Sequence, residues 1–213
     1  GMNLNGIIFN RIKLYGQLCL DEFYLKEIIA RKGWWGNKQA WQMGTKYINA
    51  FNLKGLKLQA EYNEVRPFTY THGDVQQNYS HYGMPLAHPL GANFREFLGF
   101  ITYRKKNHEF MIQGMIVKTG KDTLSSKSNI GQNIFLSYNT RSMEYGNKIT
   151  QGVKTNILQS QIRFTYYIIP QMNLRMELGY IQRWESNAEG YEIQNPYIYF
   201  AIKSSFWNSY RDF

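Results

Sequence analysis

The sequence has little of several features that would assign it to a familiar class. Cysteine occurs once, at Cys19, which excludes an internal disulfide framework and a cysteine-rich zinc site. No apolar run approaches the roughly 18 residues of a membrane-spanning helix. Acidic residues are few, because 15 Asp and Glu face 25 Lys and Arg, for a formal net charge of +10. A basic chain can attract nucleic acid, but no helix-turn-helix, RNP string or zinc finger is present, so we expect no nucleic-acid partner.

Motifs of catalysis and secretion are also missing. The chain has no G-x-S-x-G elbow, no Walker A loop, no H-E-x-x-H and no Rossmann glycine fingerprint. We therefore expect a protein that is not an enzyme and that needs no cofactor or metal. Gly1 before Met2 is typical of a residue left by tag removal, and no signal peptide is visible after it.

Aromatic residues are abundant, at 16% of the chain, and apolar and polar residues alternate with period two. Residues 56, 58, 60 and 62 are apolar or aromatic, for example, and residues 57, 59, 61 and 63 are polar. Successive side chains of a strand leave opposite faces, so this alternation predicts strands with one apolar face. The predicted strands are 6–23, 38–51, 55–66, 94–104, 108–120, 153–169, 173–185 and 196–207. Helical spacing is limited to 24–30, where a turn or two of helix is predicted.

The connections between these strands alternate between short and long. Short turns are predicted near 52–55, 105–107 and 170–172, and long loops at 24–37, 67–93, 121–152 and 186–195. Residues 133–138 have strand character but are assigned to the third long loop. This layout predicts an all-β fold, an antiparallel up-and-down β-barrel of about eight strands or part of a larger outer-membrane barrel. Residues 1–213 would form one domain, with the long loops at the extracellular end and the short turns at the other.

Period two does not tell which face is inside. A soluble barrel turns its apolar face inward, whereas a membrane barrel turns it outward to lipid. The strand lengths, the charges of both signs on the polar faces and the final aromatic Phe213 favour the membrane barrel. So do the aromatic residues near strand ends, which are typical of membrane interfaces: Tyr15, Phe23, Trp41, Phe51, Tyr103, Tyr166, Tyr167, Tyr180, Trp184, Tyr197, Tyr199, Phe206 and Trp207.

Five strings resemble one known family. They are GWWGN at 33–37, EYNEVRPFTY at 61–70, NYSHYGMPLAHPLGANFRE at 78–96, SNIGQNIF at 128–135 and YRDF at 210–213. Together they resemble the C-terminal part of the capsule assembly protein Wzi family, most closely its Bacteroidetes branch, which includes the gliding-motility protein RemB. The resemblance implies a non-enzymatic β-barrel in the cell outer membrane that binds or organises capsular polysaccharide, with a link to gliding motility. Family members are longer and have more strands.

The long loops contain the candidate binding residues. Flat aromatic rings, imidazoles and guanidinium groups are suited to sugars and uronate carboxylates, and the polysaccharide-binding candidates are Trp34, Trp35, Arg66, Tyr79, His81, Tyr82, His88 and Arg95. Two other interpretations of the loop 67–93 remain. Its histidines, at 72, 81 and 88, could bind a metal, although spacings of nine and seven match no common zinc pattern. Alternatively, the loop folds inward as a plug, and the tryptophan pair packs against a neighbouring loop.

The functional expectation is therefore a surface barrel whose partners are acidic polysaccharide and outer-membrane lipid. Its basic polar face would attract the polyanion. Two alternatives stay open: a soluble lipocalin-like β-barrel that binds a small apolar ligand, and a nonspecific pore or structural fragment.

Overall fold

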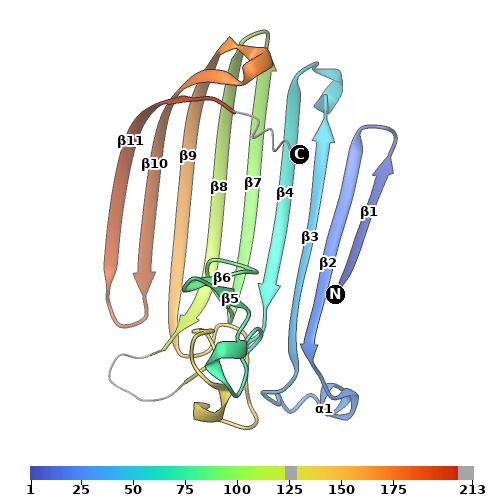
Figure 1. Cartoon of the computed structure of the whole chain (residues 1–213), viewed down its shortest axis with the longest axis vertical. Coiled ribbons are helices and arrows are strands. Elements are labelled where there is room, and N and C mark those ends of the chain that lie inside the picture. Colours follow the sequence, from blue (N-terminus) through green and yellow to red (C-terminus); the bar gives the residue numbers. More distant parts are fainter. Residues whose placement is uncertain (123–128, 206–213) are drawn as a thin grey trace, which may run out of the picture.

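The structure, a computed structural model, describes residues 1–122 and 129–205 and is all-β. Nine strands form one antiparallel sheet in the order β1-β2-β3-β4-β7-β8-β9-β10-β11 (Figure 1). Their bounds are β1 Met2–Ile8, β2 Ile12–Glu22, β3 Lys38–Ile48, β4 Leu56–Val65, β7 Phe94–Lys105, β8 His108–Lys121, β9 Val153–Ile169, β10 Leu174–Asn187 and β11 Glu192–Lys203. A small hairpin, β5 (Ser80–His81) with β6 (Met84–Pro85), stands apart from the sheet. The predicted meander of antiparallel strands is confirmed.

The strand count differs from the prediction at the N-terminus. The predicted strand 6–23 is two strands, β1 and β2, joined by a tight turn at Phe9 and Asn10, which both have positive φ. Ile8 pairs with Ile12 across three connecting residues, so even-numbered side chains stay on the same face before and after the turn. The alternation therefore continues in phase through the turn. Neither Gly nor Pro marks this turn, which is why the sequence pattern did not reveal it.

Three long connections lie at one end of the sheet, as predicted (Figure 1). The first contains helix α1 (Leu25–Ala30), which confirms the predicted short helix. Residues 133–138 form no strand, in agreement with their assignment to a loop, and lead into the 3-10 turn η3 (Tyr138–Thr140). Among the described residues, the connections at the opposite end are short turns: residues 9–11, η1 (Ala50–Asn52), residues 106–107 and η4 (Pro170–Met172).

The predicted long loop 186–195 is wrong. Ser186 pairs with Glu192, so both strands extend into this range and only residues 188–191 connect them. The Oδ1 atom of Asn187 accepts hydrogen bonds from the backbone N–H groups of Glu189 and Tyr191, at 3.0 and 2.9 Å. This side-chain bonding closes a tight hairpin where a long loop was expected.

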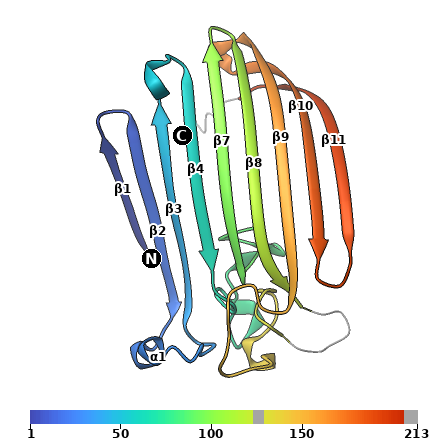
Figure 2. The same ribbon diagram turned by 180° about the vertical axis from the view of Figure 1, so that it is seen from behind.

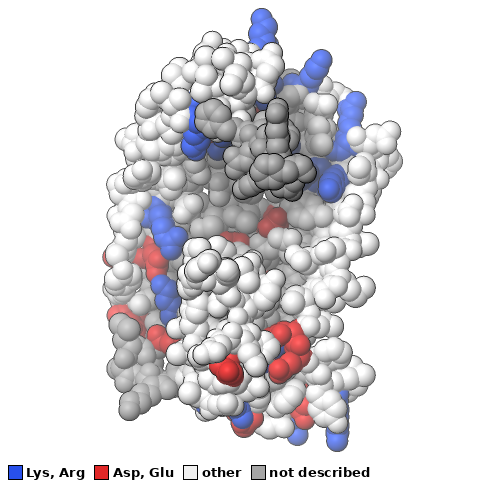
Figure 3. Space-filling model, in the orientation of Figure 1, with Lys and Arg blue, Asp and Glu red and all other residues white. Residues whose placement is uncertain are grey.

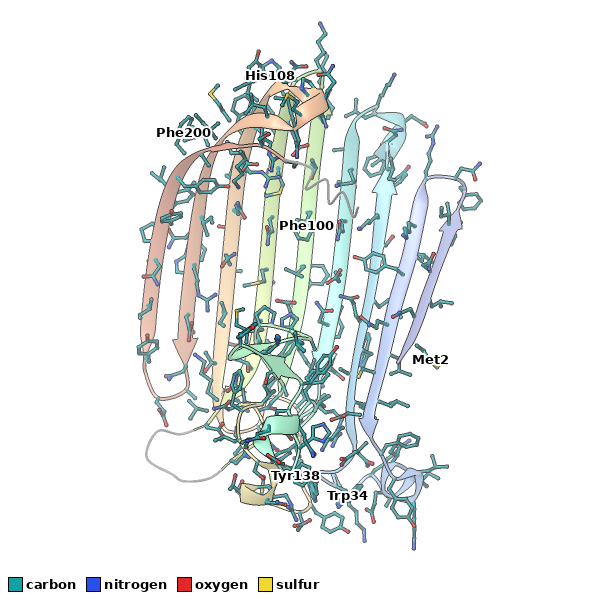
Figure 4. The ribbon with its side chains drawn as sticks, viewed as in Figure 1. Met2, Trp34, Phe100, His108, Tyr138 and Phe200 are labelled. Carbon is teal, nitrogen blue, oxygen red and sulfur yellow. The ribbon has the colours of Figure 1, made fainter. Side chains whose placement is uncertain are left out.

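The sheet is curved, and its convex face is apolar. The large apolar side chains that project from this face are exposed, among them Leu14, Met43, Phe97, Ile101, Ile112, Ile116, Leu158, Ile162, Leu178, Ile198, Phe200 and Ile202. Figure 2 views this side, and Figure 4 shows Phe200 pointing away from the sheet. The alternate residues face the concave side, where Glu177 is buried and is paired with Arg175 and Lys203, each at 2.7 Å.

The hydrophobic core lies between the concave face and the long loops. Its buried members are Ala40, Val65, Tyr70, Ala92, Phe94 and Ile134, which come from β3, β4, β7 and two of the loops. The loop between β4 and β7 folds onto the concave side, as the plug interpretation expected (Figure 1). Figure 3 shows that this side is hollowed and that charged side chains are visible within the hollow.

The sheet has two edges, β1 and β11, and no ladder of hydrogen bonds joins them in the residues described. All seven residues of β1 are exposed. Phe206, Trp207 and the closing string 210–213, which entered the sequence argument, lie outside the described residues, as does Ser128. Within the described ranges, no helix is long and apolar enough to cross a membrane.

Candidate functional site

A pocket of about 580 Å³ lies on the concave side, beneath the loop between β4 and β7. Strand residues and loop residues both line it, including Gln17, Cys19, Asp21, Gln42, Asn63, Tyr70, His72, Tyr79, His88 and Phe94. In the part of the chain that the structure describes, no Lys or Arg side chain lines this pocket. Its surface therefore combines aromatic and aliphatic side chains with amides, imidazoles, one thiol and one carboxylate.

A chain of hydrogen bonds links side chains that line the pocket to neighbouring carboxylates. The Nδ1 atom of His88 accepts from the backbone N–H of Leu90 at 3.3 Å, so the ring proton is assigned to Nε2, which donates to Glu96 at 3.0 Å. Asn63 Nδ2 donates to Glu96 at 2.8 Å and to Glu61 at 3.1 Å. These bonds tie the loop to β7 and β4 and fix the orientation of each polar group.

The network continues to the neighbouring strands. Glu61 accepts from the hydroxyl of Tyr15 at 2.6 Å and from Gln42 Nε2 at 2.9 Å. Every one of these side chains belongs to the concave face of β2, β3 or β4, where cross-strand pairing brings Tyr15, Gly44 and Glu61 level with one another. The carboxylates of Glu61 and Glu96 therefore hold Gln42 and Asn63, which line the pocket and whose amide oxygens can accept hydrogen bonds from hydroxyl groups.

Two tyrosines form one wall of the pocket. The rings of Tyr70 and Tyr79 lie 5.9 Å apart, and Tyr79 is about half exposed. Burial raises the pKa of the Tyr70 phenol, so its hydroxyl stays protonated at neutral pH. Asp21 holds the loop here, because its carboxylate accepts the backbone N–H of Tyr70 at 3.1 Å and lies 3.9 Å from His72 Nε2. Exposed ring faces beside fixed acceptors can bind a flat, hydroxyl-rich ligand.

Trp34 lies elsewhere, in the layer of loops below the strands (Figure 4), and Trp35 packs beside it. The ring of Trp35 is 4.7 Å from Tyr138 and 6.1 Å from Phe68, and Trp34 is 5.8 Å from Trp35. The guanidinium of Arg141 lies 4.3 Å from the Trp35 ring centroid. This arrangement agrees with the alternative interpretation of the sequence, in which the tryptophan pair packs against a neighbouring loop.

A buried lysine completes this aromatic cluster. Lys38 has no exposed side-chain surface, and its Nζ lies 4.3 Å from the Tyr138 ring and 5.4 Å from the Trp35 ring. The same Nζ pairs with Glu22 at 3.1 Å and donates to the carbonyl of Thr71 at 2.8 Å. A buried ammonium needs such partners to offset its lost hydration, so the cluster stabilises the loop layer.

We expect Trp35→Ala to loosen this loop layer. The substitution removes the ring that packs against Tyr138 and that faces Lys38 and Arg141, at a cost of about 2–4 kcal/mol. Faster hydrogen exchange in residues 66–93 and 129–152, with the strands unchanged, would report it. Equal exchange rates in the two proteins would show that Trp35 holds nothing in place.

The other predicted residues are dispersed. Arg66 donates from Nε to the Asn37 carbonyl at 2.8 Å, and burial lowers the pKa of its guanidinium. Arg95 lies on the convex face, paired with Glu64 at 2.6 Å. His81 and Tyr82 form the tip of the β5-β6 hairpin, where Tyr82 is 93% exposed. Of the eight predicted residues, Tyr79 and His88 line the pocket.

The three loop histidines are not brought together. His72 faces Asp21, His88 bonds to Glu96, and His81 packs against Tyr82 at 4.2 Å. Within residues 1–122 and 129–205, no group of three His, Cys, Asp or Glu side chains could hold a metal ion.

The sequence analysis missed Gln42 and Asn63, which line the pocket, and the residues bonded to them or to each other behind it, Tyr15, Glu61 and Glu96. These residues belong to four strands, and only their cross-strand register, such as Asn63 opposite Glu96, brings them together. Their one signal in the sequence is membership of the polar face, which they share with many residues that do not line the pocket.

Comparison with known proteins adds no relative: no protein-family model matches the chain, and no curated protein matches its sequence. The Wzi-like resemblance therefore rests on the five strings alone.

Proposed function

We propose that the protein is a non-enzymatic outer-membrane β-barrel, or a section of the wall of a larger one, that binds surface polysaccharide at its long-loop end. The observation that carries this proposal is the direction of the apolar face. On the convex side of β7, the outward residues from Phe97 to Tyr103 carry no charge. At about 3.3 Å per residue this stretch is roughly 20 Å long, close to the apolar band of an outer-membrane barrel.

Neighbouring strands extend the same uncharged belt. Outward positions from Met43 to Tyr47 on β3, from Phe110 to Ile116 on β8 and from Leu158 to Tyr166 on β9 are all uncharged. Exposed apolar surface of this extent is costly in water and favourable against lipid tails. The edges β1 and β11 would close on each other or pair with further strands of a larger wall.

The lipocalin-like alternative needs the opposite arrangement. A soluble barrel that binds an apolar ligand has its apolar residues around a central cavity. Here the concave side carries Glu61, Glu96 and Glu177 with their partners. The proposed membrane barrel therefore agrees better with the placement of polar and apolar side chains.

The side chains that line the pocket indicate which class of sugar it can bind. Acidic polysaccharide was the predicted partner, with Arg66 and Arg95 as its anchors, but neither lines the pocket. The one carboxylate that lines the pocket is Asp21, and a carboxylate repels uronate groups and accepts hydrogen bonds from hydroxyls. We therefore assign this pocket to an uncharged sugar unit of the polysaccharide, stacked on Tyr79.

Substitution of Tyr79 tests the assignment. We expect Tyr79→Ala to weaken binding to a neutral polysaccharide about tenfold, because one exposed aromatic contact contributes about 1–1.5 kcal/mol. Tyr82→Ala, at the hairpin tip, is the matched control and should leave binding unchanged. Affinity electrophoresis of the refolded protein in gels that contain neutral or acidic polysaccharide gives the comparison. Weaker binding by the Tyr82 variant alone would move the site to the hairpin, and unchanged binding by both variants would refute the pocket.

A further inference from the structure

Basic side chains lie at the loop-end border of the apolar belt, on the convex face. Arg95 stands directly opposite Lys118, and Lys154, which pairs with Gly120, is the diagonal neighbour of Lys118. Like charges opposite one another destabilise a sheet. Glu64 pairs with Arg95, but no ion pair joins Lys118 or Lys154 to a carboxylate in the residues that the structure covers. Three adjacent cations with one carboxylate leave room for an anionic ligand.

An apolar groove lies below this border, within the belt. Small residues in direct cross-strand register form its floor: Thr45, Ala60, Gly99 and Gly114. The groove has a volume of about 600 Å³, and Ile12, Tyr47, Leu58, Ile101 and Ile112 are among the residues that line it. A Cβ atom placed on Gly114 would meet nothing within 4 Å, so the floor is open.

The two features lie on the same strands and are close enough for one molecule. Lys118 and Gly114 are four residues apart on β8, or about 13 Å, and Ile116 lies between them on the same face. A charged lipid fits this arrangement, because its anionic group can contact Lys118 while its apolar tail passes Ile116 and enters the groove. The order of the features, charge at the border and hydrocarbon within the belt, is that of a lipid in a bilayer.

We propose that the convex face of β7, β8 and β9 binds one phosphate-bearing membrane lipid. Lys118, Lys154 and Arg95 contact its phosphate, and an acyl chain passes Ile116 and lies over Gly114 and Gly99. This site rests on the proposed function, because it requires the convex face to meet lipid.

Lipid titration of the detergent-solubilised full chain tests the site. Phosphatidylglycerol and phosphatidylcholine with identical acyl chains are added separately, and thermal unfolding reports binding. We expect an apparent Kd about tenfold lower for phosphatidylglycerol, with the difference reduced by salt. Lys118→Gln with Lys154→Gln should abolish the preference. Lys13→Gln with Lys57→Gln, both on the concave face, is the matched control and should retain it.

A second variant tests the groove. A Cβ atom at Gly114 meets nothing within 4 Å, so Gly114→Leu should fill the groove and weaken binding of both lipids while the preference for phosphatidylglycerol persists. Equal affinity for the two lipids, or an unchanged preference in the Lys118 and Lys154 double variant, would overturn the proposal. Stabilisation by inorganic phosphate alone, equal to that by phosphatidylglycerol, would also overturn it, because the site would then bind an anion and not a lipid.

Discussion

Ile112→Arg is expected to destabilise the folded protein in lipid bilayers by about 2–4 kcal/mol, while Gln113→Arg is expected to change its stability by less than about 1 kcal/mol. The two residues are adjacent on β8, but Ile112 is exposed in the middle of the convex belt and Gln113 faces the concave side. An arginine at Ile112 would place its charge against lipid tails. An arginine at position 113 would lie among the polar groups of the concave side, opposite Gln161 on the neighbouring strand β9.

The measurement is urea unfolding of the protein refolded into phospholipid vesicles, with folded protein detected by its gel mobility before heating. If the convex face met water, Ile112→Arg would be tolerated as a surface substitution, and Gln113→Arg would be the more harmful of the two. That result would refute the proposed membrane barrel and also the proposed lipid site, which depends on it. If Ile112→Arg is destabilising but the unsubstituted protein does not prefer phosphatidylglycerol, only the proposed lipid site is refuted and the membrane barrel stands.

Asn93→Ala is expected to cost about 2–4 kcal/mol, because the fully buried Asn93 joins the loop before β7 to β8 and to the loop before β9. Its Nδ2 donates to the carbonyls of Gly120 at 3.0 Å and Gln151 at 2.9 Å. Its Oδ1 accepts from the backbone N–H groups of Thr150 at 2.7 Å and Gln151 at 3.2 Å. Alanine removes all four of these hydrogen bonds. It also disfavours the positive φ of 61° at this position.

Two further variants separate these causes. Asn93→Gly loses the same hydrogen bonds but adopts positive φ freely, so it should be less destabilising than alanine by about 1 kcal/mol. Asn195→Ala, at an exposed position on β11, should be nearly neutral. The stabilities of the three variants are ranked by their unfolding midpoints in urea and by the protease sensitivity of their long loops. A neutral Asn93→Ala would show that the loops are held by other contacts.

Much of the sheet was predictable because a strand leaves its period in the sequence. The alternation on β4, β9 and β10 placed those strands within a few residues. The alternation did not reveal the turn at Phe9 and Asn10, because the same face stays apolar before and after it. It also did not reveal the hairpin after β10, which the side chain of Asn187 closes. Such turns depend on positive φ and on side-chain bonds, which residue types indicate only weakly.

The candidate site was less predictable. Tyr79 and His88 were identified because aromatic and imidazole groups stand out in a loop. The sequence also grouped them with Trp35, which packs against Tyr138, and with Arg95, which lies on the other face, and the structure does not bring these residues together. Nothing in the sequence near Asn63 indicates that it bridges Glu61 and Glu96. That contact depends on the register between β4 and β7, which is a property of the folded sheet.

The sequence by itself determined that this chain forms a meander of strands, each with one apolar and one polar face, since period two follows from strand geometry alone. Only the tertiary structure decided that the apolar face is convex and that the loop from Arg66 to Asn93 covers the polar one. The physical reason is that alternation is unchanged when inside and outside are exchanged. The curvature of the sheet and the burial of Phe94 and Ile134 against the concave side remove that symmetry.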